Sequence, residues 1–169
     1  MVYLDFDDFG EKDNRLDWFW KLKDYYPKFK VNVFAIPTWN EKQEWISYIR
    51  TLDWIQLCIH GYGHKHDDDL SEDTLNDLLN RGFAKVYKAP YWELPDSMYE
   101  RLKRLDFRIM VHHKDTREGI KINWDIRYPL PDLPVIYGHG HISSTQGNGL
   151  VESFANLMKL PKETEFGFL

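Results

Sequence analysis

Residues 53–64 read DWIQLCIHGYGH, an apolar run that stops at a histidine followed by a glycine-rich turn. Tryptophan, isoleucine and leucine in a short run favour a strand, and glycine favours the turn that ends it. Residues 71–82 then begin with serine, carry acids in the first turn and finish on glycine, which is typical of a capped helix. A strand followed by a helix predicts one unit of a parallel sheet with crossover helices.

The same alternation extends outward in both directions along the chain. Apolar runs predict the strands, and segments with apolar residues at helical spacing predict the helices. The expected strands cover residues 2–6, 30–36, 53–60, 83–90, 107–113, 120–126 and 133–139, and the expected helices cover 14–26, 40–52, 71–82, 94–105 and 149–160. This pattern predicts an α/β fold, either a small, distorted (β/α)7 barrel with mostly parallel strands or an open doubly wound sheet. No repeat or linker divides the chain, so we expect a single domain over residues 1–169.

Charge and hydropathy argue against several classes of partner. The formal net charge is −5 and no long basic stretch is present, so we expect no nucleic-acid partner. No apolar run approaches the roughly 20 residues that span a bilayer, so we expect no membrane partner. The first residues, MVYLDFDD, lack a signal-peptide pattern, and we expect a cytoplasmic protein. No long heptad pattern argues for a coiled-coil dimer, and we expect a monomer.

The cysteine and aromatic content point in different directions. Cys58 is the only cysteine and lies in an apolar run, so we expect it to be a buried hydrophobic residue. Aromatic residues make up 16% of the chain and include seven tryptophans. Some of these rings belong to a core, and others could line a groove, because flat rings stack well on sugar faces.

Polar motifs follow four of the expected strands. They are FDDFG at 6–10, HGYGH at 60–64, KAPYW at 88–92 and GHGH at 138–141. The carboxyl ends of parallel strands meet at one edge of the sheet, where α/β proteins bind their ligands. We therefore expect all four motifs to lie on one face of the domain.

The first motif ends an apolar strand with two adjacent carboxylates. Strand geometry points Asp7 and Asp8 in different directions, so one could bind a metal ion while the other acts as a base. Asp5 lies on the same side as Asp7, deeper in the strand. The alternative interpretation is an aspartate-rich turn that leads into Gly10, with Asp8 as a cap.

The second motif spaces His60 and His64 four residues apart around two glycines. In a tight loop both imidazoles can meet one ion, and with a carboxylate they suit Zn²⁺ and leave a position open for water. A solvated, histidine-rich loop is the alternative. His66 and the acids at 67–69 run into the next helix, and we expect them on the surface.

The remaining motifs are ambiguous by themselves. KAPYW could be a strand-to-loop corner, or a wall of the site made by Tyr91 and Trp92 with a backbone N–H facing it. GHGH places His139 and His141 at a strand end, where one could be a general acid near neutral pH or both could be structural.

In this order, FDDFG, HGYGH, KAPYW, NWD at 123–125 and IYGH at 136–139 resemble the motifs of the NodB-like polysaccharide deacetylases, carbohydrate esterase family 4. The resemblance covers the chain from its first strand to about His141. The family pattern is Thr-Phe-Asp-Asp-Gly, His-x-x-x-His, Arg-x-Pro-Tyr, an Asp/Trp element and Leu-x-His. It implies a distorted (β/α)7 barrel with one divalent metal ion that removes N-acetyl groups from a glycan. Zn²⁺ is the metal that we expect first, and Co²⁺, Ni²⁺ and Mn²⁺ also suit such ligands.

Matching positions imply the central roles. The resemblance implies that Asp8, His60 and His64 are the metal ligands and that Asp7 is the catalytic base. It implies that His139 is the general acid.

Other positions imply the surroundings of the substrate. The resemblance implies that the N–H of Tyr91 stabilises an oxyanion and that Trp124 walls the acetyl pocket. Trp92 is expected beside the substrate, and His141 competes with His139 for the acid role.

Three departures from the family pattern stand out. Phe9 separates the second aspartate from Gly10. Lys88 replaces the arginine that positions the base, which keeps the charge but loses the planar fork. Asn123 stands where an acid is expected, and Asp125 is the candidate to supply that carboxylate and hold His139 in its charged form.

Two other functions fit the same residues. One is a sugar-binding barrel without catalysis, since one fold hosts many functions. The other is a metal-dependent amidohydrolase that acts on a small non-sugar C–N bond.

Overall fold

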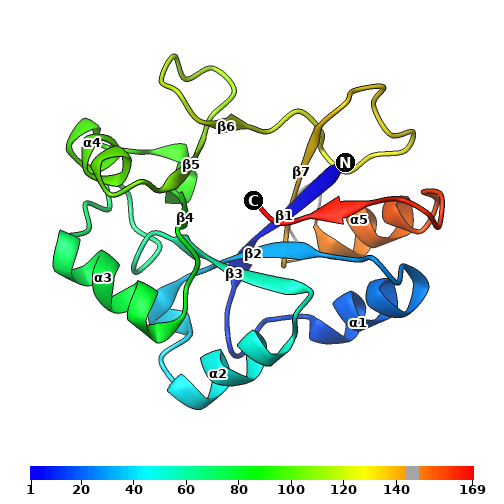
Figure 1. Cartoon of the computed structure of the whole chain (residues 1–169), viewed down its shortest axis with the longest axis horizontal. Helices are drawn as coiled ribbons and strands as arrows, with labels where there is room; N and C mark the ends of the chain where they lie inside the picture. The colour runs from blue at the N-terminus through cyan, green and yellow to red at the C-terminus, as the bar shows by residue number, and fades with distance from the viewer. Residues whose placement is uncertain (144–148) are drawn as a thin grey trace.

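The computed structural model describes residues 1–143 and 149–169, and its strands form a barrel with helices on the outside (Figure 1). Strands and helices alternate along the chain as expected. The elements are β1 (Val2–Phe9), α1 (Leu16–Tyr25), β2 (Val31–Ala35), η1 (Pro37–Trp39), α2 (Gln43–Thr51), β3 (Ile55–His60), α3 (Glu72–Arg81), β4 (Val86–Lys88), η2 (Pro90–Trp92), α4 (Asp96–Arg104), β5 (Arg108–Val111), β6 (Ile120–Lys121), β7 (Ile136–His141), α5 (Leu150–Leu157) and β8 (Phe166–Gly167). None of the helices in the described ranges is long and apolar enough to span a bilayer.

The strand order distinguishes the two expected folds. The sheet runs β6-β5-β4-β3-β2-β1-β7, with β8 also paired to β1, and the pairs along it are parallel. Sequential strands whose last member returns beside the first make a barrel, whereas a doubly wound sheet reverses direction at its centre. The expected (β/α)7 barrel is therefore confirmed.

Helix α3 illustrates why the sequence forms its elements where it does. Ser71 accepts a hydrogen bond from the N–H of Thr74 at 3.1 Å, which satisfies one of the free donors of the first turn. Gly82 ends the helix at φ 110°, a conformation that favours glycine. Leu75 and Leu78 are buried against the sheet.

The strands separate two apolar cores. The larger core fills the layer between the strands and the outer helices. A smaller cluster, made of Phe34, Cys58, Val86, Met110 and Leu169, comes from successive strands and the C-terminal residue. Strand alternation places this cluster inside the barrel. Cys58 is fully buried, as expected.

A short segment closes the barrel between β5 and β7. Residues Ile120 and Lys121 pair with β5, and the next residues turn to β7, where the amides of Asn123 and Trp124 both donate to the carbonyl of Tyr137 at 3.2 Å. The strand expected over 120–126 is therefore only two residues long, because the segment divides its hydrogen bonds between two neighbours.

Candidate active site

A β-bulge in β1 presents two adjacent carboxylates to the same space. The pairing with β2 shifts between Phe6 and Phe9, and Asp8 adopts φ 66°. Oδ2 of Asp7 lies 3.7 Å from Nε2 of His60, and Oδ1 of Asp8 lies 3.8 Å from the same nitrogen. The other oxygens point to different partners, Oδ1 of Asp7 to Lys88 and Oδ2 of Asp8 to His141, and the bulge brings both carboxylates near His60.

Asp8, His60 and His64 form a compact set of candidate metal ligands. Each offers one ligand atom, and these atoms all lie within 4.8 Å of one another. Nε2 of His64 is 3.2 Å from Oδ1 of Asp8. The three residues come from the ends of β1 and β3 and the loop after β3, so the fold brings together the residues that the motif spacing singled out.

Both imidazoles are oriented by contacts on their far side. Nδ1 of His60 lies 3.0 Å from the backbone carbonyl of Lys88, to which only a protonated nitrogen can donate. Nδ1 of His64 lies 3.1 Å from the hydroxyl of Tyr91. In this arrangement Nε2 of each ring faces Asp8, as in sites where a second contact fixes the ligand tautomer.

The chemistry of this set fits a divalent cation. Oδ1 of Asp8 is buried and has no hydrogen-bond partner among the described residues. Burial raises the pKa of Asp8, but the imidazoles of His141, His64 and His60 lower it well below its usual range. Burial lowers the pKa of His60, which favours the neutral ring that binds metal. The hydrogen bond and charge of Asp8 raise the pKa of His64, so a metal ion bound there would replace that proton. Two imidazoles and a carboxylate suit Zn²⁺ and related ions.

Asp7 lies beside this set and is paired with Lys88. The carboxylate is 4% exposed, and Nζ of Lys88 donates to its Oδ1 at 2.7 Å. Burial raises the pKa of Asp7, but the charge of Lys88 and the neighbouring histidines lower it to about 2. Lys88 is itself fully buried, and burial lowers its pKa, but the attraction of Asp5 and Asp7 raises it. Asp7 is therefore ionised at neutral pH, with Oδ2 turned towards the metal set.

The carboxylate that contacts His139 is Asp5. Oδ1 of Asp5 lies 2.6 Å from Nδ1 of His139, and both side chains are buried. Asp125, expected in this role, is exposed to solvent. Asn123, which stands where the family has an acid, has a structural role instead. Its side-chain oxygen accepts from the N–H of Tyr137 at 2.8 Å and helps to close the barrel. The expectation for Asp125 is wrong because the segment after β6 turns its side chain outward.

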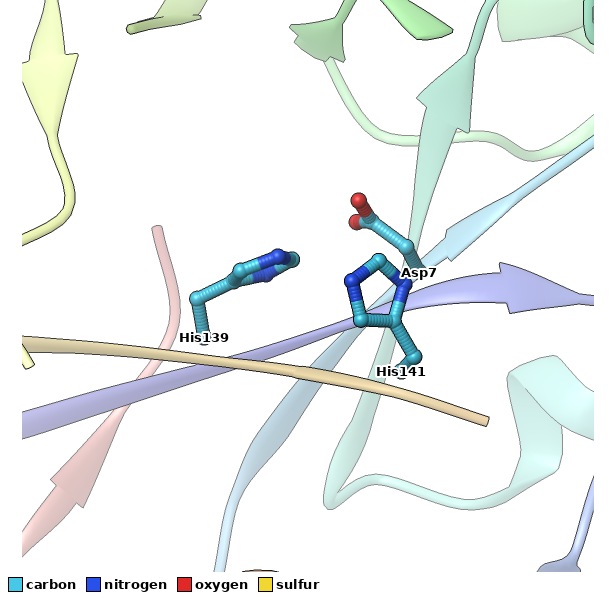
Figure 2. Close-up of side chains that lie close together, drawn as sticks. All are labelled: Asp7, His139 and His141. Carbon is cyan, nitrogen blue, oxygen red and sulfur yellow. The ribbon is translucent and has the colours of Figure 1, made fainter. Parts of the chain in front are cut away.

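The side chains of Asp7, His139 and His141 converge from adjacent strands. Figure 2 shows the two rings on β7 and the carboxylate on β1 turned towards the same space. Their ligand atoms also lie within 4.8 Å of one another. Nδ1 of His141 is 3.7 Å from Oδ2 of Asp8, so His141 faces the metal set while His139 faces Asp5.

Comparison with known proteins identifies the fold. No sequence-family model and no curated protein sequence matches the chain. Among solved structures, a peptidoglycan N-acetylglucosamine deacetylase superimposes with a TM-score of 0.68 at 21% identity, over 99% of this chain and 85% of the other. The chitin deacetylase of Colletotrichum lindemuthianum gives a TM-score of 0.64 at 15% identity, over 99% and 84% of the two chains.

The chain has the fold of the family 4 carbohydrate esterases. A pseudoenzyme of that family from Bacillus anthracis has the same fold, with a TM-score of 0.61 at 16% identity, over 100% of this chain and 63% of the other. The fold is thus shared by proteins with and without activity, and the function has to be argued from the site.

Aromatic rings surround the candidate site on the side of β4. Tyr91 is 50% exposed, at φ 55°, and stacks on His66 with ring centroids 4.0 Å apart. None of the hydrogen bonds among the described residues uses the N–H of Tyr91. The ring of Trp92 covers Nζ of Lys88, with the nitrogen 4.7 Å from the ring centroid, and lies 5.9 Å from the ring of His139.

Trp124 lies beside β7, where it pairs with Gly138. Its ring packs on Gly138, and its indole N–H donates to the carbonyl of Arg127 at 2.7 Å. The side chain is 7% exposed, and the carbonyl of Trp124 accepts from the N–H of His139 at 3.0 Å. Trp124 therefore supports the strand that carries the two histidines, and it is almost fully buried.

Sequence reasoning missed two contributors to the site. It noted Asp5 but gave it no partner, because the register that sets Asp5 opposite His139 joins residues far apart in the chain. It did not single out Trp39, whose ring is 45% exposed and lies 5.7 Å from the ring of His64. His66 is exposed as expected, but Asp68 accepts from the N–H of Tyr62 at 2.6 Å and so holds the loop that carries His64.

Proposed function

We propose that this protein is a metal-dependent hydrolase that removes N-acetyl groups from an amino-sugar polymer and releases acetate. The observation that carries the proposal is the set of Asp8, His60 and His64, in which the buried Oδ1 of Asp8 has no hydrogen-bond partner among the described residues. Asp7 and His139 flank it on the same face of the barrel.

The metal would be held by Asp8, Nε2 of His60 and Nε2 of His64. A divalent ion bound there supplies Lewis acidity, which polarises the acetyl carbonyl and acidifies water. The known activity of structural neighbours on peptidoglycan and chitin supports an N-acetylated glycan as the substrate class.

The side chains of this protein would move the protons. Asp7, ionised and held by Lys88, accepts a proton from the water that attacks the carbonyl carbon. The N–H of Tyr91 donates to the developing oxyanion, and one such donor is typically worth about 10²–10³ in rate. His139 donates a proton to the nitrogen as the C–N bond breaks, so that acetate and a free amine leave.

A calorimetric titration of Zn²⁺ into metal-stripped protein tests the metal set. We expect one tight site in the wild type and an affinity at least about tenfold weaker in His64→Ala. His66→Ala, from the same loop, is the matched control and should bind as the wild type does. Equal affinity in all three proteins would contradict the assignment.

Acetate release from N-acetylglucosamine oligomers tests the reaction itself. The Zn²⁺-loaded wild type should release acetate, and Asp7→Asn should abolish turnover while it keeps the metal. Binding of oligomers without acetate release would instead favour a non-catalytic barrel, like the pseudoenzyme that shares this fold. Turnover only on small amides would favour the second enzyme class.

A further inference from the structure

Asp5 is a buried carboxylate to which the reaction above assigns no part. It lies on β1, is 1% exposed and pairs in register with His139 on β7. Its Oδ1 is 2.6 Å from Nδ1 of His139 and 3.0 Å from Nζ of Lys88. We propose that Asp5 is the positioning residue of His139, which fixes the ring with Nδ1–H directed at the buried carboxylate and Nε2 on the opposite edge; this rests on the proposed function.

The donors and acceptors around Nδ1 define the orientation of the ring. Nδ1 of His139 lies near two groups, Oδ1 of Asp5 at 2.6 Å and Nζ of Lys88 at 3.1 Å. An ammonium group has three N–H donors, and two of those on Lys88 bind Asp5 and Asp7. An ionised carboxylate can only accept, so the shorter contact is an Nδ1–H that donates to Asp5. The nitrogen on the other edge of the ring, Nε2, is then the one that protonates a leaving group.

The charges of the cluster explain why a second carboxylate is needed. The charged groups that face His139 are Asp5 and Asp7 on β1 and Lys88 on β4, with His141 beside it on β7. Without Asp5, the ammonium of Lys88, 3.1 Å from Nδ1 of His139, would donate to that nitrogen and turn it into an acceptor. With Asp5, a carboxylate oxygen lies 2.6 Å from Nδ1, and this nitrogen carries the proton.

Asp5 is a further departure from the family pattern, and it is coupled to the departure at Lys88. Asp5 stands where the family motif has threonine, and Lys88 stands where it has arginine. One ammonium nitrogen reaches both Asp5 and Asp7 with separate hydrogen bonds. Asp5 on β1 thus supplies the carboxylate that Asn123 lacks. The cation beside the general acid His139 and the base Asp7 is the compact ammonium of Lys88 in place of a guanidinium.

Activity measurements on two substrates separate positioning from a structural role. In Asp5→Asn we expect kcat on N-acetylglucosamine oligomers to fall at least about tenfold, since general acids contribute about 10²–10⁴. KM for the oligomers should change little, because Asp5 is buried and does not reach the substrate. Hydrolysis of 4-nitrophenyl acetate should persist, because its leaving group needs no proton. Asp24→Asn, an exposed carboxylate on α1, is the control and should match the wild type.

Nitrogen-15 NMR of the histidine rings in the Zn²⁺-loaded protein gives a readout that needs neither turnover nor a folded variant. In the wild type we expect Nδ1 of His139 to stay protonated when the ring is neutral. A ring protonated only at Nε2, or an Asp5→Asn variant with unchanged kcat on the oligomers, would overturn the proposal. If the wild type releases no acetate but shows the Nδ1–H ring, the proposed function fails and the positioning role of Asp5 stands.

Discussion

Asp7 and Lys88 form a buried ion pair whose strength is set by the surroundings of both groups. Neither side chain is more than 6% exposed, and the atoms in contact are 2.7 Å apart. Lys88 also lies over the rings of Phe34 and Trp92, at 4.9 and 4.7 Å from their centroids. Because a buried ion repays its lost hydration only through several good contacts, this many partners account for a charged lysine inside the barrel.

The pair predicts a loss of stability in acid. The pKa of Asp7 falls from 3.8 to about 2 on folding, so its contribution is complete above the unfolded value and is lost as the pH falls towards 2. The shift corresponds to about 2 kcal/mol. In chemical unfolding of metal-free protein, the stability difference between wild type and Asp7→Asn should shrink by this amount between about pH 5 and pH 2. A difference that is constant with pH would contradict the pairing.

At the residue level, local spacing and long-range pairing differ in what they reveal. His60 and His64 could be singled out because four residues separate them and glycines surround them. The link between Asp5 and His139 could not, since it depends on the register of two strands at opposite ends of the chain. Asp125 was mistaken for that partner because it is near Trp124 in sequence.

At the level of single elements, the absence of a side chain at Gly138 of β7 allows Trp124 to pack beside the site. A Cβ on Gly138 of β7 would lie 2.7 Å from Cε3 of Trp124 and 3.1 Å from Cδ2 of Leu4. The indole ring can therefore cover β7 only because residue 138 is glycine. The contact between Trp124 and Gly138 supports β7 next to His139, which faces the candidate site.

Gly138→Ala should accordingly destabilise the protein. Overpacking of this kind typically costs about 1–3 kcal/mol, because the ring or the strand has to shift. Gly63→Ala is the control, since its nearest contact would be an ordinary 3.5 Å. Thermal unfolding of both variants checks the prediction, and equal melting temperatures would show that the ring gives way freely.

The helices could be predicted from sequence more closely than the strands. Caps such as Ser71 and Gly82 act within one turn, so the sequence marks where a helix begins and ends. The end of a strand depends on its partners. The bulge at Asp8 and the early end of β6 both arise from pairing with neighbouring strands, which no local pattern records.

At the scale of the molecule, barrel closure gathers the polar strand ends into one site. Alternating strands and helices alone did not distinguish a barrel from an open sheet, because both have that order. The pairing of β1 with both β2 and β7 makes the difference. It brings Asp7 next to His141, residues from the first and the last strand of the barrel.

The short segment that closes the barrel also defines where the molecule should open most easily. Local opening costs little where few hydrogen bonds hold a segment, and amide hydrogen exchange measures that cost residue by residue. The amides of Asn123 and Trp124 share one carbonyl acceptor, whereas Val33 and Leu57 lie in the continuous pairing of β2 and β3. In deuterated buffer we expect Asn123 and Trp124 to exchange well before Val33 and Leu57. If so, the barrel opens most easily between β6 and β7, beside His139. A glycan of the proposed class would then enter at that point, while the strands that carry Asp8 and His60 stay paired.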